Sequence, residues 1–208
     1  MQFDEKCFAN GFIWLIAAAI SLNNLAFASG QHNFSARDSS LEFSVQILGL
    51  LKKSGQFTDF DGRLERTVGA PKTASVWLSI RSNSAQMRSK KDTEMVKGAS
   101  FFAAAKFPEV RFESEPFDAT LLLDIKSAHP ISGYLSLRGK RLSETLNLQV
   151  LSCKNLAALE KCSFQVSGKL GRARYGMQSH RAFVSDDVLL SLTIQGEVAG
   201  EAGKVVGK

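Results

Sequence analysis

Alternation of apolar and polar side chains recurs along almost the whole chain after residue 35, and this feature restricts the possible fold most strongly. At residues 41–47, for example, Leu, Phe, Val and Ile alternate with Glu, Ser and Gln. Because successive side chains of a strand point to opposite faces, a period of two predicts a strand with one buried face. We therefore expect an all-β protein with antiparallel strands. Further segments of this kind, separated by turn signals rich in Gly, Pro, Asp and Ser, lie at residues 76–80, 110–114, 131–138, 146–150, 164–168 and 188–195.

Residues 91–106 break this rhythm. Alanines, Met95 and paired phenylalanines favour a helix there, and Gly98 is expected to divide it into two short pieces. Pro108 disfavours the α region for the residue before it, so the helical part ends and an alternating strand follows. Many antiparallel strands with one helical excursion indicate a barrel or a sandwich, and periodicity alone leaves both open.

The first 28 residues are interpreted as an export signal rather than as part of the fold. Lys6 provides a weakly positive start, residues 12–20 form an apolar core too short to span a bilayer, and residues 26–28, AFA, match an A-x-A cleavage site. The alternative is an uncleaved membrane anchor, because two acidic residues dilute the positive start. Export predicts a periplasmic or secreted protein.

A basic balance remains once this signal is set aside. The following 180 residues carry 25 basic and 18 acidic side chains, a net charge of +7, and their number suits one domain. Basic residues cluster at residues 52–53, 88–91 and 138–141, either in solvated loops or where they meet an anionic membrane surface or a diphosphate headgroup. Nucleic acid is not an expected partner, because export separates the chain from it and no motif of that class is present.

Two cysteines, Cys153 and Cys162, follow the export signal. They bracket the loop between the alternating segments 146–150 and 164–168, so a disulfide between them would clamp a hairpin. Export supports this pairing, because disulfides persist in oxidising compartments. A metal site is the alternative, but two thiols without a nearby histidine do not complete a zinc shell. We therefore expect a disulfide and no metal.

Residues for catalysis are not grouped in a recognisable way. His32, His129 and His180 are scattered, and no nucleophile elbow, P-loop or glycine-rich dinucleotide motif is present. The carboxylate pair Asp186 and Asp187 lies in a turn signal, where such residues commonly bond to the backbone. The sequence accordingly predicts a protein that is not an enzyme and that needs no cofactor.

Four short sequence anchors follow one another along the chain. They are SSLEFSV at 39–45, GQFTDFDG at 55–62, FFAAAKFPEVRFES at 101–114, and GYLSLRG at 133–139 with RYGM at 174–177 and VSDDVLL at 184–190. The most telling anchor is the run at residues 101–114, where aromatic residues are stopped by a proline and pass into a strand. In their order and spacing the anchors resemble the signature of the YceI-like family, whose members are periplasmic lipocalin-like barrels that bind polyisoprenoid lipids. The resemblance covers residues 34–199 and implies an antiparallel lipocalin-like β-barrel of about eight strands, with its helical excursion near residues 91–106. Glycine and small or charged residues at the end of the chain predict a flexible tail at residues 200–208.

The resemblance also implies a function: non-catalytic binding, transport or storage of a long-chain amphiphile, such as a quinone or a polyprenyl phosphate. The main alternative is an interaction or structural protein of a membrane redox or stress system, with a barrel filled by its own side chains. A hydrolase is a minor third reading. The sequence does not indicate the oligomeric state.

Candidate ligand contacts follow from the inward faces of the expected strands and from the helical excursion. Arg111 and Arg174 are expected to contact a headgroup, because a guanidinium suits bidentate binding of phosphate, although alternation with Phe112 would place Arg111 on the outer face. The apolar residues expected to point inward are Phe43, Val45, Phe57, Phe60, Phe101, Phe102, Phe107, Phe112, Leu135 and Leu137.

Overall fold

The computed structural model describes residues 30–67, 72–154 and 161–195. The expected export signal at residues 1–28 and the expected tail at residues 200–208 lie outside the described residues. Within the described ranges, no helix is long and apolar enough to cross a bilayer.

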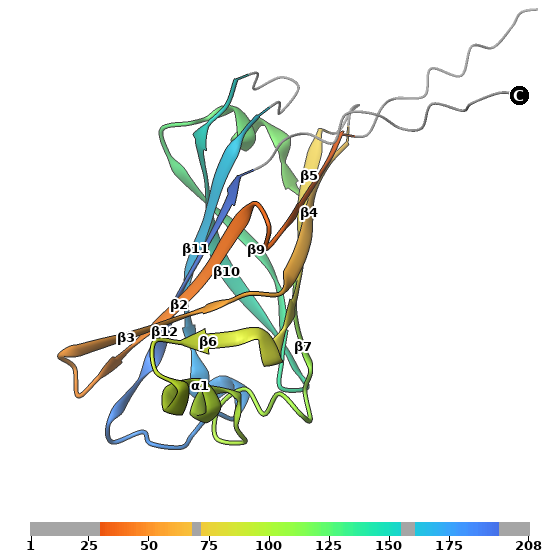
Figure 1. Ribbon diagram of the computed structural model, residues 1–208. Helices are drawn as coiled ribbons and strands as arrows, with labels where there is room; N and C mark the ends of the chain where they lie inside the picture. The colour runs from red at the N-terminus through yellow and green to blue at the C-terminus, as the bar shows by residue number, and fades with distance from the viewer. Residues whose placement is uncertain (1–29, 68–71, 155–160, 196–208) are drawn as a thin grey trace, which may run out of the picture.

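One antiparallel sheet contains all twelve described strands (Figure 1). Besides one α-helix, α1 (Lys90–Lys97), there are three short 3₁₀ helices, η1 (Ser82–Ser84), η2 (Ala119–Leu123) and η3 (Arg172–Tyr175). The strands are β1 (Gly30–Ser35), β2 (Ser39–Ile47), β3 (Leu51–Phe57), β4 (Phe60–Arg66), β5 (Thr73–Arg81), β6 (Ala85–Met87), β7 (Glu109–Ser114), β8 (Phe117–Asp118), β9 (Ala128–Leu137), β10 (Lys140–Ser152), β11 (Ser163–Gly171) and β12 (Val184–Gln195).

The sheet curls back on itself, and its two sides meet at the first strands. β1 and β2 follow one another with only residues 36–38 between them, yet β1 pairs with β4 while β2 pairs with β12. The remaining neighbours run in the order β4-β5-β7-β9-β10-β11-β12, so the continuous β1–β2 segment joins the two sides of the curl. The expected all-β, antiparallel, lipocalin-like class is confirmed. The strand count of twelve exceeds the expected eight for two reasons. The nearly continuous segments β1–β2 and β3–β4 are each counted as two strands, and β6 and β8 are short additions.

Alternation along each strand directs apolar side chains to the interior. In β5, Ala74, Val76, Leu78 and Ile80 are buried, whereas Trp77 lies on the outer face beneath the guanidinium of Arg63, 4.7 Å from the ring centroid. This is the arrangement that a period of two predicts for a half-buried strand.

Gly62 allows the bent strands to approach closely. A Cβ atom on Gly62 would lie 2.3 Å from Cζ of Phe34 and 2.7 Å from the carbonyl oxygen of Trp77. Any other residue there would displace the ring of Phe34 on β1 and push β4 away from β5, since real Cβ atoms do not approach a carbonyl oxygen this closely.

The helical excursion is shorter than the sequence predicted. Ser89 caps α1 by accepting a 3.0 Å hydrogen bond from the amide of Asp92, and the helix ends at Lys97 with Gly98 as its C-cap. We expected a second helical piece after Gly98, but residues 98–107 form successive turns instead. Ala103 adopts a positive φ of 48°, which is incompatible with a right-handed helix.

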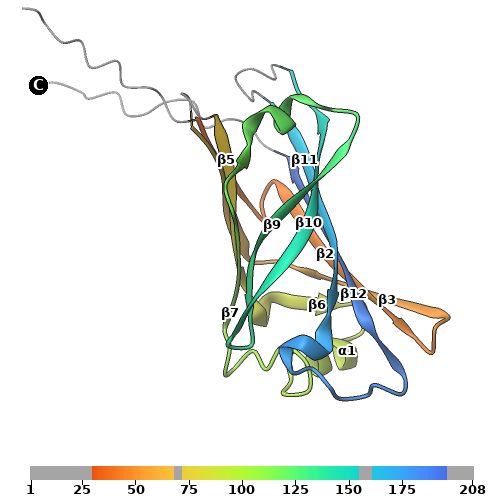
Figure 2. The ribbon, with the colours of Figure 1, turned by 180° about the vertical axis from the view of Figure 1, so that it is seen from behind.

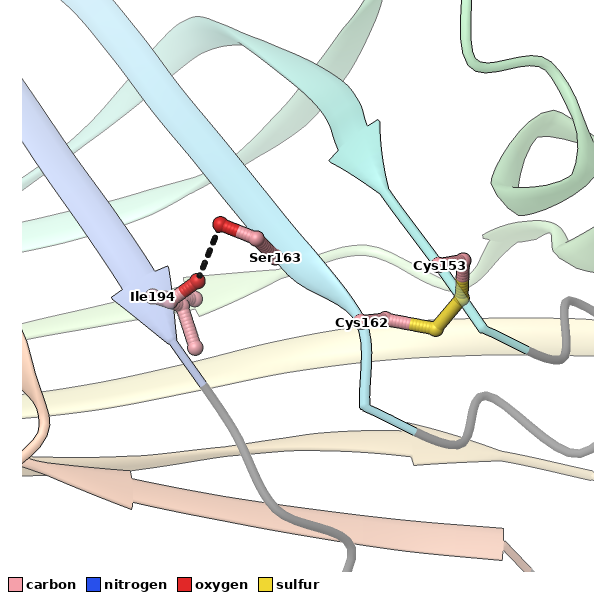
Figure 3. Close-up of a disulfide and its surroundings, with 4 residues drawn as sticks. All are labelled: Cys153, Cys162, Ser163 and Ile194. Atoms are coloured by element: carbon pink, nitrogen blue, oxygen red, sulfur yellow. Dashed lines mark hydrogen bonds between the residues drawn. A yellow bond between two sulfur atoms is a disulfide. The ribbon is translucent and has the colours of Figure 1, made fainter.

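A disulfide joins Cys153, just after β10, to Cys162, just before β11, as predicted (Figure 3). Next to it, the Ser163 hydroxyl donates a 3.2 Å hydrogen bond to the carbonyl oxygen of Ile194. The bridge therefore ties the loop end of the β10–β11 hairpin at a point where β11 is also bonded to β12.

Candidate binding cavity

The curled sheet encloses an apolar cavity of about 190 Å³. Its wall is formed by inward-facing side chains of the barrel strands and is covered by residues of α1 and the turns that follow it. The lining residues are Leu41, Phe43, Val45, Ile47, Lys53, Phe57, Val76, Leu78, Ile80, Met87, Asp92, Met95, Val96, Phe101, Phe102, Val110, Phe112, Leu135, Leu137, Glu144, Leu146, Val166, Ser167, Leu170, Arg172, Tyr175, Met177, Val184, Val188, Leu190 and Leu192.

Most of the apolar residues expected to point inward do line this cavity. They come from β2, β3, β7 and β9, where the two-residue period already separated the faces, and from the turns after α1. Their contact with a ligand stays a prediction. The residues that reach the wall are Phe43, Val45, Phe57, Phe101, Phe102, Phe112, Leu135 and Leu137.

Two of the expected phenylalanines lie elsewhere, and we leave them out of the site. Phe60 is buried in the core at the start of β4, where its backbone pairs with Ile80, but it does not reach the cavity wall. Phe107 packs against Gly139, so closely that a Cβ atom there would lie 3.0 Å from its Cε1 atom. Phe107 therefore seals the β9–β10 turn instead of lining the cavity.

The two arginines proposed for a headgroup also lie outside the wall. Arg111 is on the outer face of β7, where its Nη2 lies 2.7 Å from Oε2 of Glu109, as strand alternation requires. Arg174 donates a 2.6 Å hydrogen bond to Oε1 of Glu144 and is half exposed. Of these two arginines, only Arg174 therefore approaches the cavity, through the carboxylate that it holds.

Three aromatic rings close the cavity toward α1. Phe102 lies edge-on to Phe43 and Phe57, with ring centroids 5.8 and 5.3 Å apart, and Phe43 lies 5.2 Å from Phe57. The amide of Phe102 donates a 3.0 Å hydrogen bond to the carbonyl of Val96, which anchors the turn to the end of α1. Such edge-to-face pairs add stability beyond their buried area.

A polar pair that the sequence analysis did not identify stands in the apolar wall. Glu144 faces inward from β10, only 8% exposed, and its Oε1 accepts a 2.7 Å hydrogen bond from the hydroxyl of Tyr175. Burial, and then the bond to Glu144, raises the pKa of Tyr175, so the hydroxyl remains a donor. The sequence did contain a signal, because Glu144 interrupts the apolar face formed by Leu142, Leu146 and Leu148.

Arg172 is the second polar group that the sequence analysis missed. It is 2% exposed and lines the cavity, with its guanidinium carbon 5.9 Å from the ring centroid of Phe101. Burial lowers the pKa of Arg172 below the ordinary value for arginine, yet arginine remains charged in proteins. Its hydrogen bonds, 2.5 to 2.9 Å long, go to the carbonyl oxygens of Met177, Ser179, Val184 and Ser185.

An ion pair lies at the rim of the cavity. Nζ of Lys53 on β3 is 2.5 Å from Oδ2 of Asp92 on α1, and both residues contribute to the wall. Hydrogen bonds from Lys53 and then Ser89 lower the pKa of Asp92 below its usual value. The pair ties the helix to the sheet beside the opening.

The strongly curled antiparallel sheet and its enclosed cavity define the class of lipocalin-like β-barrels. The chain belongs to the YceI-like family, because the model of the YceI-like domain matches residues 32–196.

Its relatives include a UPF0312 protein of Staphylococcus aureus, 22% identical over 81% of this chain and 94% of that protein, and one of Yersinia pestis, 26% identical over 80% and 82%.

Solved structures share the fold. The structure of BcnA from Burkholderia cenocepacia gives a TM-score of 0.65 at 17% identity and covers 77% of this chain and 98% of that chain. A polyisoprenoid binding domain from Saccharophagus degradans, implicated in plant cell wall breakdown, gives a TM-score of 0.57 at 15% identity and covers 82% and 99%.

Proposed function

We propose that the protein is a non-catalytic carrier or store of a long-chain amphiphile and that it holds the apolar chain inside the barrel. The observation that carries this proposal is the cavity of about 190 Å³ with a wall made almost wholly of aliphatic and aromatic side chains. Close-packed protein interiors contain few voids larger than a water molecule, so such a space favours a ligand over a barrel filled by its own side chains. An apolar chain would gain ~25 cal/mol for each Å² removed from water.

A polyisoprenoid, such as a quinone or a polyprenyl phosphate, is the ligand class that we propose. The relative from Saccharophagus degradans is described as a polyisoprenoid binding domain, which supports this choice. The cavity offers polar contacts only at a few places in its wall, chiefly Glu144, Tyr175 and Arg172. A ligand with one small polar end and a long hydrocarbon chain matches this distribution.

We place this activity in the periplasm or outside the cell. The basis is the export signal expected from the sequence, supported by the Cys153–Cys162 disulfide, since disulfides persist in oxidising compartments.

Native mass spectrometry of freshly purified protein, followed by organic extraction, tests lipid carriage. We expect an extractable long-chain lipid in the wild type and much less in Leu190→Trp, because Leu190 lines the cavity and an indole would occupy it. Leu189→Trp is the matched control, since the neighbouring Leu189 lies on the exposed face of the same strand.

The proposal fails if wild-type protein carries no lipid and takes up neither a polyprenyl phosphate nor a quinone from detergent. Equal retention by Leu190→Trp and Leu189→Trp, with both variants folded, would place bound lipid outside the cavity. An empty barrel that co-purifies with a membrane redox protein would favour the interaction-protein alternative.

A further inference from the structure

The turn between β2 and β3 presents leucines to solvent. Leu48, Leu50 and Leu51 are 61%, 89% and 63% exposed. Hairpin turns are usually polar, with Gly, Asn and Asp leading their composition. In Figures 1 and 2 this hairpin projects from the barrel at the end that carries α1.

The backbone of this turn does not call for a leucine. The amide of Leu50 donates a 3.1 Å hydrogen bond to the carbonyl of Ile47, and the two central residues, Leu48 and Gly49, have φ values of 51° and 71°. Two positive φ values define a type I′ turn, for which Asn-Gly is strongly preferred. Leucine is uncommon in this conformation and is largely exposed here, so folding alone does not account for it.

A fourth exposed apolar side chain is attached to this turn. The amide of Leu48 donates a 2.7 Å hydrogen bond to the carbonyl of Phe183, whose side chain is 59% exposed. Arg172 fixes the segment that leads to Phe183 by binding carbonyls on both sides of it, at Ser179 and Val184. We call Leu48, Leu50, Leu51 and Phe183 the apolar tip.

Positive charge surrounds the apolar tip. Lys52 and Arg181 are both exposed, and within the described ranges no carboxylate lies within 4.0 Å of either. The nearby acids are otherwise engaged, because Asp187 pairs with Lys169 and Asp186 accepts the amide of Ala173. An apolar tip flanked by free cations complements the interface of a bilayer that contains anionic lipids.

The apolar tip also adjoins the cavity. Ile47 directly precedes the turn, Val184 directly follows Phe183, and both line the cavity wall while pairing with one another. β12 bulges beside this pair, since the three residues between Val184 and Val188 oppose only one residue, Gln46, on β2. Bulges commonly occur at barrel rims and near functional sites.

We propose that the apolar tip inserts into the surface of an anionic phospholipid bilayer and brings the cavity rim onto the membrane. Leu48, Leu50, Leu51 and Phe183 enter the boundary between headgroups and acyl chains, while Lys52 and Arg181 meet lipid phosphates. The use of this contact, exchange of a lipid between bilayer and cavity, rests on the proposed function. Membrane binding itself does not.

Vesicle flotation of the purified protein tests the contact. We expect binding to vesicles of equal parts phosphatidylcholine and phosphatidylglycerol, with much weaker binding to phosphatidylcholine alone. The double variant Leu48→Asn/Leu50→Asn should lose about tenfold in partitioning, and Lys52→Gln about fivefold.

Folding and membrane binding separate cleanly in this experiment. Leu48→Asn creates the preferred Asn-Gly pair, so its melting temperature should equal or exceed that of the wild type while its binding falls. The matched control is Leu123→Asn/Ile125→Asn, which removes two exposed apolar side chains in and just after η2, at the other end of the barrel in Figure 1. This control should bind vesicles as the wild type does.

Unchanged flotation of Leu48→Asn/Leu50→Asn would overturn the proposal. A concentration-dependent dimer that Leu48→Asn/Leu50→Asn abolishes, without vesicle binding by the wild type, would overturn it in favour of a second copy as the occupant. Vesicle binding by a protein that retains no lipid would leave the docking surface standing and remove the proposed function. Lipid retention without vesicle binding would overturn the docking surface and leave the proposed function standing.

Discussion

The hydroxyl of Tyr175 donates a 2.7 Å hydrogen bond to Oε1 of Glu144 inside an otherwise apolar wall. The two residues are separated by 31 positions in the sequence, and the bond joins η3 to the middle of β10. Arg174 approaches the same oxygen from the solvent side at 2.6 Å. A buried carboxylate is costly unless it is paired and bonded, so this arrangement keeps a negative group at the cavity.

Loss of the Tyr175 hydroxyl should destabilise the barrel. Tyr175→Phe removes a bond to a charged acceptor, and we expect the free energy of unfolding to fall by about 1.5 to 3 kcal/mol, measured by urea denaturation. Tyr134→Phe is the control, because Tyr134 lies on the outer face with the guanidinium of Arg141 stacked 3.9 Å from its ring centroid. Equal stability of wild type and Tyr175→Phe would show that Arg174 alone satisfies the carboxylate.

Arg172 should be irreplaceable by lysine. Its planar guanidinium donates to four carbonyl oxygens, a geometry that a single ammonium does not reproduce. Arg172→Lys should therefore lower the free energy of unfolding by about 2 to 4 kcal/mol and increase hydrogen exchange at residues 177–184. Arg174→Lys, at a half-exposed position, should leave exchange in that segment unchanged. Unaltered protection in Arg172→Lys would contradict the role of Arg172 as the anchor of this segment.

Stability should decline in mild acid because of His32. The residue is 2% exposed, and neither ring nitrogen has a hydrogen-bond partner among the described residues. Burial lowers the pKa of His32 below 6.5, against a smaller opposing effect of Asp38. The unfolded chain therefore takes up a proton at a higher pH than the folded chain does. The free energy of unfolding should be fully retained above the unfolded pKa and should decrease as the pH falls toward the folded pKa.

The measurement is a series of urea denaturations from about pH 8 to about pH 5. His32→Phe should remove this part of the pH dependence, because it takes away the titrating group and suits an apolar site beside Phe164, whose ring centroid lies 5.9 Å from that of His32. His129→Gln should leave it in place. If the free energy of unfolding of His32→Phe still falls with pH as in the wild type, the acid sensitivity belongs to another group.

Reduction of the Cys153–Cys162 disulfide should weaken the fold moderately. The bridge spans a sequence separation of 9, and closing a ring of this size stabilises a folded protein by about 2 to 3 kcal/mol in the chain-entropy description. Cys153→Ser/Cys162→Ser should show that loss in urea denaturation, whereas added reductant should affect the wild type only. Two free thiols in protein labelled directly from the exported fraction would contradict the pairing.

Local patterns in the sequence determined which faces of the strands are buried, where the helical excursion ends and which cysteines pair. The period of two in β5 or β9 places one face inward whatever the neighbouring strand is, because side-chain direction is a property of the strand itself. The position of Pro108 and the pair Cys153 and Cys162 were likewise readable, since each acts over a few residues or at a recognisable spacing. The resemblance to the YceI-like family selected a barrel, where periodicity alone left a barrel and a sandwich open.

Tertiary structure alone decided which inward residues meet a cavity. Phe57 and Phe60 stand on either side of one bend, yet only Phe57 reaches the wall, because the pairing of β1 with β4 and of β2 with β12 sets where the interior is filled. The Glu144–Tyr175 bond and the apolar tip also depend on distant segments that the curl of the sheet brings together. A two-residue period reports the face of a strand but carries no information on the distance across the barrel, and that distance separates core from cavity.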